Sequence, residues 1–362
     1  MAARSSGNLT VDPSSSDVLD VSSDLLVGER EAKRLEEPEF TWSYTDEPHA
    51  TRRHEIVKAH PEVKKLFGHC PLTKYKVAGS VLLQLLSVHL LHDCESSAVY
   101  WFCCYTLSGT VNHMMTLAMH ELSHNLGAKK PAHNRLLGIL ANLPLGLPAS
   151  ASFRRYHMEH HRFQGEVVLD VDVPTRLEGE VFTTSTLKVL WCLLQPAFYS
   201  LRPAYINPKG PGEWEAYNLA AQLTFDALVY NCYGFWGLTY LVLGTLFGMG
   251  VHPVAGHFIA EHYVMNTGQE TYSYYGPLNW LTFNVGYHNE HHDFPFIAGT
   301  NLPKVRSLAP EFYDKVPHYH SWSKVILDYI ADEKIGPFSR IKRVTTSNDE
   351  IAKLKARGGL VR

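Results

Sequence analysis

Residues 96–119 read SSAVYWFCCYTLSGTVNHMMTLAM, and the five residues after them, 120–124, read HELSH. The first stretch contains no Asp, Glu, Lys or Arg, and about 20 apolar residues suffice for a helix to cross a bilayer. The second stretch places two histidines four positions apart, directly after the apolar run. The sequence therefore predicts a membrane-spanning helix that ends in a histidine cluster.

Two further apolar runs indicate a polytopic membrane protein. Residues 77–91 carry no formal charge, and only the short segment 92–95 separates them from the run quoted above, as in a hairpin turn. Residues 216–260 contain one charged residue, Asp226, and are long enough for two spans hinged near residues 231–234. We therefore expect an all-α membrane protein with about four transmembrane helices in two hairpins.

The long segment between the second and third spans is expected to face the cytosol. Residues 136–152 and 189–201 within it are apolar but broken by Pro or Gly, which favours re-entrant or interfacial segments. Positive residues mark the cytosolic side of a membrane protein, and neither hairpin turn contains one. The segment holds ten of them: Lys129, Lys130, Arg135, Arg154, Arg155, Arg162, Arg176, Lys188, Arg202 and Lys209.

Composition divides the chain into four regions. Residues 1–38 are rich in Ser, Asp and Glu and are expected to form a disordered tail. Residues 39–75 form a cytosolic region whose basic stretch, 52–67, is predicted to lie on the membrane surface or to be a simple solvated helix. Residues 76–345 form the membrane-embedded domain, and residues 346–362 are expected to be a C-terminal tail.

Three histidine clusters carry the chemistry: His120-Glu-Leu-Ser-His124, His157-Met-Glu-His160-His161 and His288-Asn-Glu-His291-His292. Positions i, i+3 and i+4 of a helix share a face, so each cluster presents its imidazoles together. Imidazole is a common ligand of iron, copper, nickel and zinc. Eight rings are too many for one ion, so two metal ions are predicted. All three clusters are expected in one cytosolic cap.

Other residues are candidates for the same site. His262 is expected to be a ninth metal ligand, with His257 nearby as a candidate for contact with the site or the substrate. The acids inside the boxes are expected to orient the rings as hydrogen-bond acceptors, or else to be ordinary solvated residues: Glu121, Glu159 and Glu290. Asp226, a carboxylate in an apolar run, contacts a substrate hydroxyl or amide, or has a structural partner.

Two other classes of protein compete with the two-metal interpretation. His120-Glu121-x-x-His124 matches the motif of an intramembrane zinc peptidase, in which Glu121 is the general base. That enzyme would leave six histidines of two matching clusters unexplained. A transporter or metal sensor would need polar residues along the spans, and these are scarce apart from Asp226 and a few amides.

The three boxes and their spacing resemble the membrane fatty-acyl desaturase and hydroxylase superfamily over residues 40–345. More narrowly, the chain resembles the sphingolipid Δ4-desaturases, whose N-terminal region would correspond to residues 39–75. Five stretches carry this likeness: FTWSYTDEPH (40–49), NHMMTLAMHELSHN (112–125), GHFIAEH (256–262), YSYYGPLN (272–279) and FNVGYHNEHHDFP (283–295).

The resemblance implies a fold, a reaction and a set of partners. It implies a double bond introduced at C4–C5 of the long-chain base of dihydroceramide, in ceramide biosynthesis, with two iron ions and O2. Electrons would come from NAD(P)H through cytochrome b5 and its reductase, in the endoplasmic reticulum membrane. C4-hydroxylation of the same lipid stays open. The family's ligand pattern falls on His120, His124, His157, His160, His161, His288, His291 and His292, with His262 at the extra position.

The chain departs from related families in two places. Its first box has three residues between the histidines, where acyl-CoA desaturases have four, which argues against a coenzyme A ester as substrate. The segment His252-Pro-Val-Ala-Gly256 lacks the His-Pro-Gly-Gly haem motif of a fused cytochrome domain. Electrons are therefore expected from a separate protein.

Overall fold

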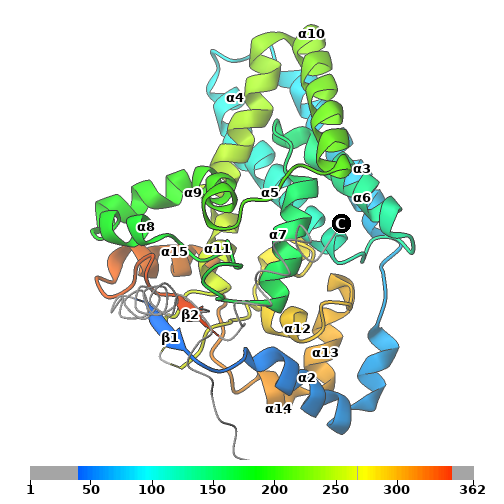
Figure 1. Ribbon diagram of the computed structural model, residues 1–362. Helices are drawn as coiled ribbons and strands as arrows, with labels where there is room; N and C mark the ends of the chain where they lie inside the picture. The colour runs from blue at the N-terminus through cyan, green and yellow to red at the C-terminus, as the bar shows by residue number, and fades with distance from the viewer. Residues whose placement is uncertain (1–39, 267, 345–362) are drawn as a thin grey trace, which may run out of the picture. The chain divides into compact units, whose positions relative to one another are not determined.

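The computed structural model describes residues 40–266 and 268–344 (Figure 1). The two tails predicted at 1–38 and 346–362 lie outside the described residues. The described part is mostly helical, as predicted, but it also contains two three-residue strands that the all-α expectation did not include.

The elements follow one another along the chain as short helical turns (η), longer helices (α) and strands (β). In order they are β1 (Thr41–Ser43), α2 (Pro48–Ala59), η1 (Pro61–Leu66), α3 (Thr73–Leu91), α4 (Ala98–Cys103), η2 (Cys104–Ser108), α5 (Gly109–Ser123), α6 (Pro131–Asn142), η3 (Leu143–Leu145), α7 (Ser150–Arg162), α8 (Arg176–Val181), α9 (Ser185–Ile206), α10 (Glu213–Met249), η4 (Pro253–Gly256), α11 (His257–Ala260), η5 (Pro277–Trp280), α12 (His288–Asp293), η6 (Gly299–Asn301), α13 (Leu302–Leu308), α14 (Pro310–Tyr313), α15 (Trp322–Ala331) and β2 (Ile341–Arg343).

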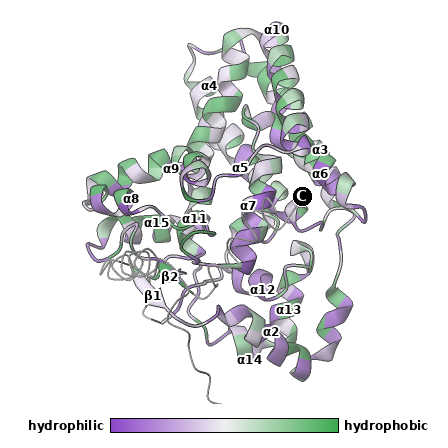
Figure 2. Ribbon diagram, viewed as in Figure 1, coloured by the Kyte–Doolittle hydropathy of each residue, from purple (hydrophilic) through white to green (hydrophobic). Residues whose placement is uncertain are grey.

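Helices α3, α5 and α10 pack together and form the most apolar part of the molecule (Figures 1 and 2). The backbone of α10 breaks at Gly234, where φ is 67° and ψ is −168°. A positive φ is readily available only to glycine, and the break lies in the hinge predicted at residues 231–234. Gly234 thus divides α10 into two limbs.

Length and composition identify one helical stretch among the described residues that can cross a membrane, Glu213–Ala260. A second candidate is the pair Pro131–Leu145 and Ser150–Arg162, bent by 115°, which is a broken span or a re-entrant loop. This bend lies in the segment predicted to be re-entrant. The four spans and their two hairpins stay a prediction.

The apolar segment 189–201 is less broken than its sequence suggests. It lies inside α9, which continues for 22 residues with Pro196 and Pro203 in its interior. Several leucines of α9 remain exposed while Trp191 and Cys192 are buried, so the helix is apolar on more than one side.

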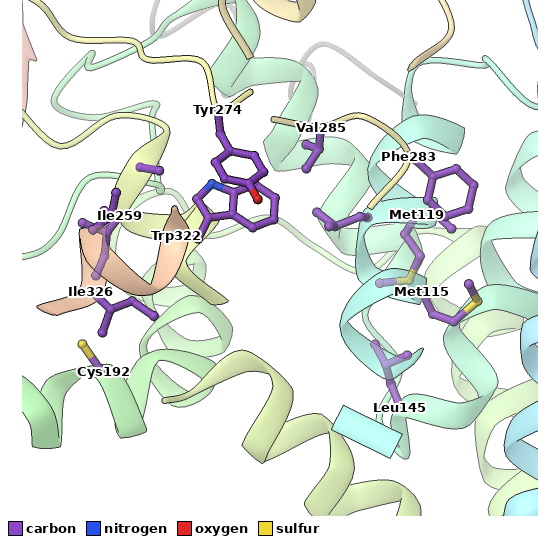
Figure 3. Close-up of a cluster of buried hydrophobic side chains, with 14 of the residues drawn as sticks. Met115, Met119, Leu145, Cys192, Ile259, Tyr274, Phe283, Val285, Trp322 and Ile326 are labelled. Carbon is purple, nitrogen blue, oxygen red and sulfur yellow. The ribbon is translucent and has the colours of Figure 1, made fainter. Parts of the chain in front are cut away.

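The main hydrophobic core connects the apolar bundle to the C-terminal helices. Met115 and Met119 enter it from α5, and Trp322 and Ile326 enter it from α15 (Figure 3). The ring of Tyr274 stacks on that of Trp322, with 4.1 Å between the ring centroids. This core ties the loop before the third box to the ends of the apolar helices.

The N-terminal region packs against protein, so α2 is not the simple solvated helix that was one of the two expectations. Ile56 of α2 and Val63 of η1 are buried in a second core with Phe294 and Ile297, which follow the third box. Strand β1 pairs in parallel with β2, so the first and last described segments are joined.

We predict that Gly248→Ala destabilises the protein. A Cβ atom on Gly248 would overlap the backbone oxygen of Gly109, and backbone cannot rotate away as a side chain can. Overpacking of this kind costs about 1–3 kcal/mol. Gly79→Ala is the matched control in α3, because a Cβ atom there meets nothing within 4 Å. Thermal unfolding in detergent should show a lower midpoint for Gly248→Ala only; equal midpoints would contradict the close contact.

Candidate metal centre

The three histidine boxes lie on three separate elements. The first occupies the C-terminal end of α5, where His124 is the capping residue. The second lies in the last turns of α7, and the third makes up most of α12. Box spacing places the histidines of each element on one side, so the folding of the chain decides whether the three sets meet.

Five histidines from all three boxes form a first group. Their candidate ligand nitrogens all lie within 4.8 Å of one another. The Nε2 atoms of His124 and His157 are 2.8 Å apart, and those of His161 and His291 are 3.1 Å apart. The members are His120, His124, His157, His161 and His291.

A second group contains His160, His262 and His292, again with ligand nitrogens within 4.8 Å of one another. Nε2 of His262 lies 3.1 Å from Nε2 of His160 and 2.9 Å from Nε2 of His288. Nε2 of His292 is buried and has no hydrogen-bond partner among the described residues. The structure therefore places His262 among the box histidines, at the position expected for a ninth ligand.

The two groups are neighbours. The rings of His161, from the first group, and His292, from the second, are nearly parallel, with 4.1 Å between their centroids. All nine histidines of the sequence-based prediction are thus accounted for in one buried site.

The geometry and protonation of the rings fit metal ions. A nitrogen ligand lies about 2.1 Å from a bound ion, so two ligands at right angles are about 3 Å apart, close to the observed separations. Burial, followed by the neighbouring imidazoles, lowers the pKa of His157, His161 and His292 well below the ordinary value. Neutral rings keep the lone pair that a metal needs. The histidine-rich site is therefore compatible with two metal ions.

Comparison with known proteins identifies the family. The pattern of the family described as "Fatty acid desaturase" matches residues 95–323, which include all three boxes. That of "Sphingolipid Delta4-desaturase (DES)" matches residues 36–72.

The chain belongs to the fatty acid desaturase family. It is 50% identical to the sphingolipid delta(4)-desaturase DES1 of Drosophila melanogaster over 86% of this chain and 97% of that protein. It is 51% identical to a DES1-like protein of Oryza sativa subsp. japonica, over 88% and 97% of the two chains. The sphingolipid delta(4)-desaturase/C4-monooxygenase DES2 of Bos taurus is 50% identical, over 84% and 95%.

Asp170, outside the boxes, orients one box histidine, and Glu261 lies near another without a hydrogen bond to it among the described residues. Asp170 lies 3.0 Å from Nδ1 of His160, and Glu261 lies 3.4 Å from Nδ1 of His288. Burial lowers the pKa of His160, but Asp170 raises it more, so the net shift is upward. A carboxylate on the far nitrogen fixes the ring and makes it a stronger ligand. Sequence reasoning missed both acids, although Asp170 belongs to an LDVDV stretch, residues 169–173, in which acids alternate with apolar residues.

The acids inside the boxes form hydrogen bonds with residues of adjacent segments. Glu121 accepts from the backbone N–H of Gly299 at 3.1 Å, and Glu159 accepts from Lys209 at 2.6 Å. Glu290 accepts from a neighbouring serine and a neighbouring tyrosine, both at 2.7 Å. All three are buried, so they are not solvated. They attach the box helices to adjacent segments.

Two other candidates have structural partners. Asp226 accepts a hydrogen bond of 2.8 Å from Gln222, one turn earlier on α10. Nδ1 of His257 lies 2.9 Å from Nε2 of His113 and 3.2 Å from the carbonyl oxygen of Val254. Neither belongs to the two groups of converging histidines.

The third box is held by the N-terminal region. Asp293, directly after His292, is fully buried and accepts hydrogen bonds from Arg52 at 2.6 Å and from His49 at 2.8 Å. Arg52 also donates to Asn289 inside the box at 2.8 Å. Burial raises the pKa of Asp293, but Arg52 and His49 lower it more, so this carboxyl is ionised at neutral pH. Helix α2 therefore fixes α12, which carries three of the nine histidines.

We predict that Arg52→Leu lowers the metal content of the purified protein. The change leaves the Asp293 carboxylate buried without its main partner, which costs about 3–5 kcal/mol and loosens α12. Lys58→Leu, at an exposed position of the same helix, is the control. Metal per chain by mass spectrometry, together with the thermal midpoint, should fall for Arg52→Leu and stay normal for Lys58→Leu. Normal metal content in both variants would show that α2 does not support the site.

Proposed function

We propose that this chain is a sphingolipid Δ4-desaturase, which introduces a double bond at C4–C5 of the long-chain base of a dihydroceramide-type lipid. The observation that carries the proposal is the convergence of nine histidines into two adjacent groups. Relatives about 50% identical over most of both chains bear this name, which supports the substrate class.

The proposed cofactors are two iron ions and O2. When bound, they supply the oxidising power that removes hydrogen from an unactivated methylene, which acid–base side chains alone cannot do. The proposed ligands are the eight box histidines and His262: His120, His124, His157, His160, His161, His262, His288, His291 and His292. A zinc peptidase would use His120 and His124 with one more ligand, whereas here they lie among three further imidazoles.

The protein's own contribution is to position groups and to exclude water. Asp170 accepts from Nδ1 of His160 and so directs Nε2 toward the second group of histidines. Burial keeps rings such as His157, His161 and His292 neutral and limits the access of water, which favours selective reaction at one methylene. The substrate must be held with C4 and C5 against this site.

A second candidate reaction is C4-hydroxylation of the same lipid. The Bos taurus relative is named both delta(4)-desaturase and C4-monooxygenase. Both reactions begin by removing hydrogen at the same place on the chain, so one histidine site can support either.

We further propose that the protein resides in the endoplasmic reticulum membrane, with its termini and histidine boxes in the cytosol. The support is the excess of Lys and Arg in the segment that contains the second box. Electrons would come from NAD(P)H through cytochrome b5 and its reductase, because the sequence has no haem motif of its own.

The proposed docking face for the electron donor is basic. Lys129 and Lys130 are exposed just after the first box. Other basic residues of the segment have partners: Arg155 pairs with Glu215 at 2.8 Å, and Arg154 donates to the backbone oxygen of Ser123. The two lysines are therefore the charges best placed to attract an acidic partner.

Expression of the chain in a host without Δ4-unsaturated long-chain bases tests the function. We expect such bases to appear, and His160→Ala and His291→Ala, one from each group of histidines, to abolish them with normal membrane levels. Lipid mass spectrometry and metal analysis, with about two irons per chain expected, are the measurements. Full activity of either variant would contradict the metal-ligand assignment, 4-hydroxylated bases alone would favour the second reaction, and one zinc would favour the peptidase.

Charge reversal tests the electron-donor proposal. Lys129→Glu combined with Lys130→Glu should raise the donor concentration needed for half-maximal turnover. The dependence of turnover on salt should also weaken, because salt screens the steering by exposed charges that the variant has lost. Lys334→Glu combined with Lys324→Glu changes the net charge equally outside this segment and should have little effect. Unchanged donor and salt dependence in the first variant, with normal iron content, would show that docking occurs elsewhere.

A further inference from the structure

A surface groove leads to the first group of histidines. It consists of two pockets of about 540 and 490 Å3. Both pockets are lined by His69, Ala128 and Lys129, so they adjoin one another at these residues. The groove runs between the segment before α3, the turn after the first box and helix α6.

One end of the groove reaches the candidate metal site. His124 lines the first pocket together with its neighbour Asn125, and Phe67 and Phe296 form the opposite wall. Asn125 has a positive φ of 63°, and its Oδ1 atom is buried without a hydrogen-bond partner among the described residues. An unsatisfied buried acceptor is costly unless a ligand or water donates to it. This end therefore offers an acceptor directly beside a proposed metal ligand.

The other end of the groove is apolar and opens on apolar surface. Leu136, Leu137 and Leu140 of α6 line the second pocket. Leu136 is 57% exposed. At the start of α3, Leu72 is 59% exposed and Tyr75 is 65% exposed. Helix α6 belongs to the bent pair that is a broken span or a re-entrant loop, so this surface suits contact with lipid.

We propose that this groove binds the lipid substrate and admits it from the membrane. The proposal rests on the proposed function, since C4 and C5 of a long-chain base lie next to the carbons that bear its hydroxyl and amide groups. The polar head must therefore lie near His124 while the alkyl chain runs away from it. The polar head lies beside Asn125, and the chain lies on the leucines of α6.

The basic rim of the groove does not by itself favour a protein partner. Lys74, Lys129 and His133 line the pockets, but the surface between them is formed by leucine side chains. Long side chains with a charged tip are common where a lipid-binding surface meets water. The apolar lining of the groove thus fits a lipid with a polar head, while Lys129 on its rim also belongs to the proposed docking face for the electron donor.

Ala128→Phe tests the groove, because residue 128 lines both pockets and its hydrogen bonds with Asn134 use only the backbone of residue 128. Ala132→Phe, at an exposed position of α6 outside both pockets, is the matched control. We expect KM for dihydroceramide to rise at least about tenfold in Ala128→Phe, with iron content and donor dependence unchanged. The control should resemble the natural chain.

Binding is measured without turnover by photo-crosslinking. A dihydroceramide analogue with a diazirine in its long-chain base is irradiated with the full-length protein in the absence of reductant, and labelled peptides are mapped. The labelled residues should lie within 124–140, and dihydroceramide should compete with the label. Labelling should be lost in Ala128→Phe but not in Ala132→Phe. Asn125→Gly, which keeps the positive φ but removes the acceptor, should weaken displacement by dihydroceramide while iron content stays normal.

The outcomes separate the groove from the function. If the natural chain forms the Δ4 product but Ala128→Phe matches its control in KM and labelling, the groove proposal is wrong and the function stands. If labelling behaves as expected but the natural chain forms no Δ4 product, the function fails while the lipid site stands. A rise in the donor requirement of Ala128→Phe, with unchanged KM for the lipid, would assign the groove to the donor and overturn the proposal.

Discussion

Nine imidazoles must share one buried site, and the rest of the structure is arranged around that constraint. Nitrogen atoms about 3 Å apart on rings with lowered pKa values, such as those of His124 and His157, make few favourable contacts with one another, because neutral rings cannot all donate. The proposed metal ions would satisfy these nitrogens together, provided that the fold holds the rings in place. The chain does so with separate supports: core packing behind α5, buried acids behind α7, and the Arg52–Asp293 ion pair behind α12.

Local patterns in the sequence predicted the parts of this site that depend on local geometry. Spacing of three and four residues placed the histidines of each box on one side, and charge-free runs marked the apolar helices. The sequence also predicted His262 as a ninth ligand of two metal ions, and its ring lies beside those of His160 and His288. The same helical geometry explains where the side chain of Glu121 lies. A residue next to His120 points about 100° away from it around the helix, so its carboxylate meets Gly299 instead.

The supports could not be predicted, because they join residues that are distant in the sequence. Arg52 and Asp293 are 241 positions apart, and nothing in the local sequence of either one identifies the other. Each is also unremarkable by itself, since Arg and Asp are common on surfaces. The π-helical turn at η2 is a similar case: a charge-free run shows that a segment can enter a membrane, but the local form of the helix depends on packing.

The position of the site relative to the apolar helices follows from the substrate that is proposed for it. The first box begins where an apolar run ends, and α12 lies beyond the apolar bundle in a more hydrophilic part of the molecule (Figure 2). A lipid whose reactive carbons adjoin its polar head presents those carbons at the membrane boundary, not at its centre. A site buried deep among the spans would require the hydroxyl and amide groups to leave water without partners, at a cost of several kcal/mol. A site at the helix ends avoids that cost, and polar groups such as Asn125 can then meet the head while leucine side chains meet the chain.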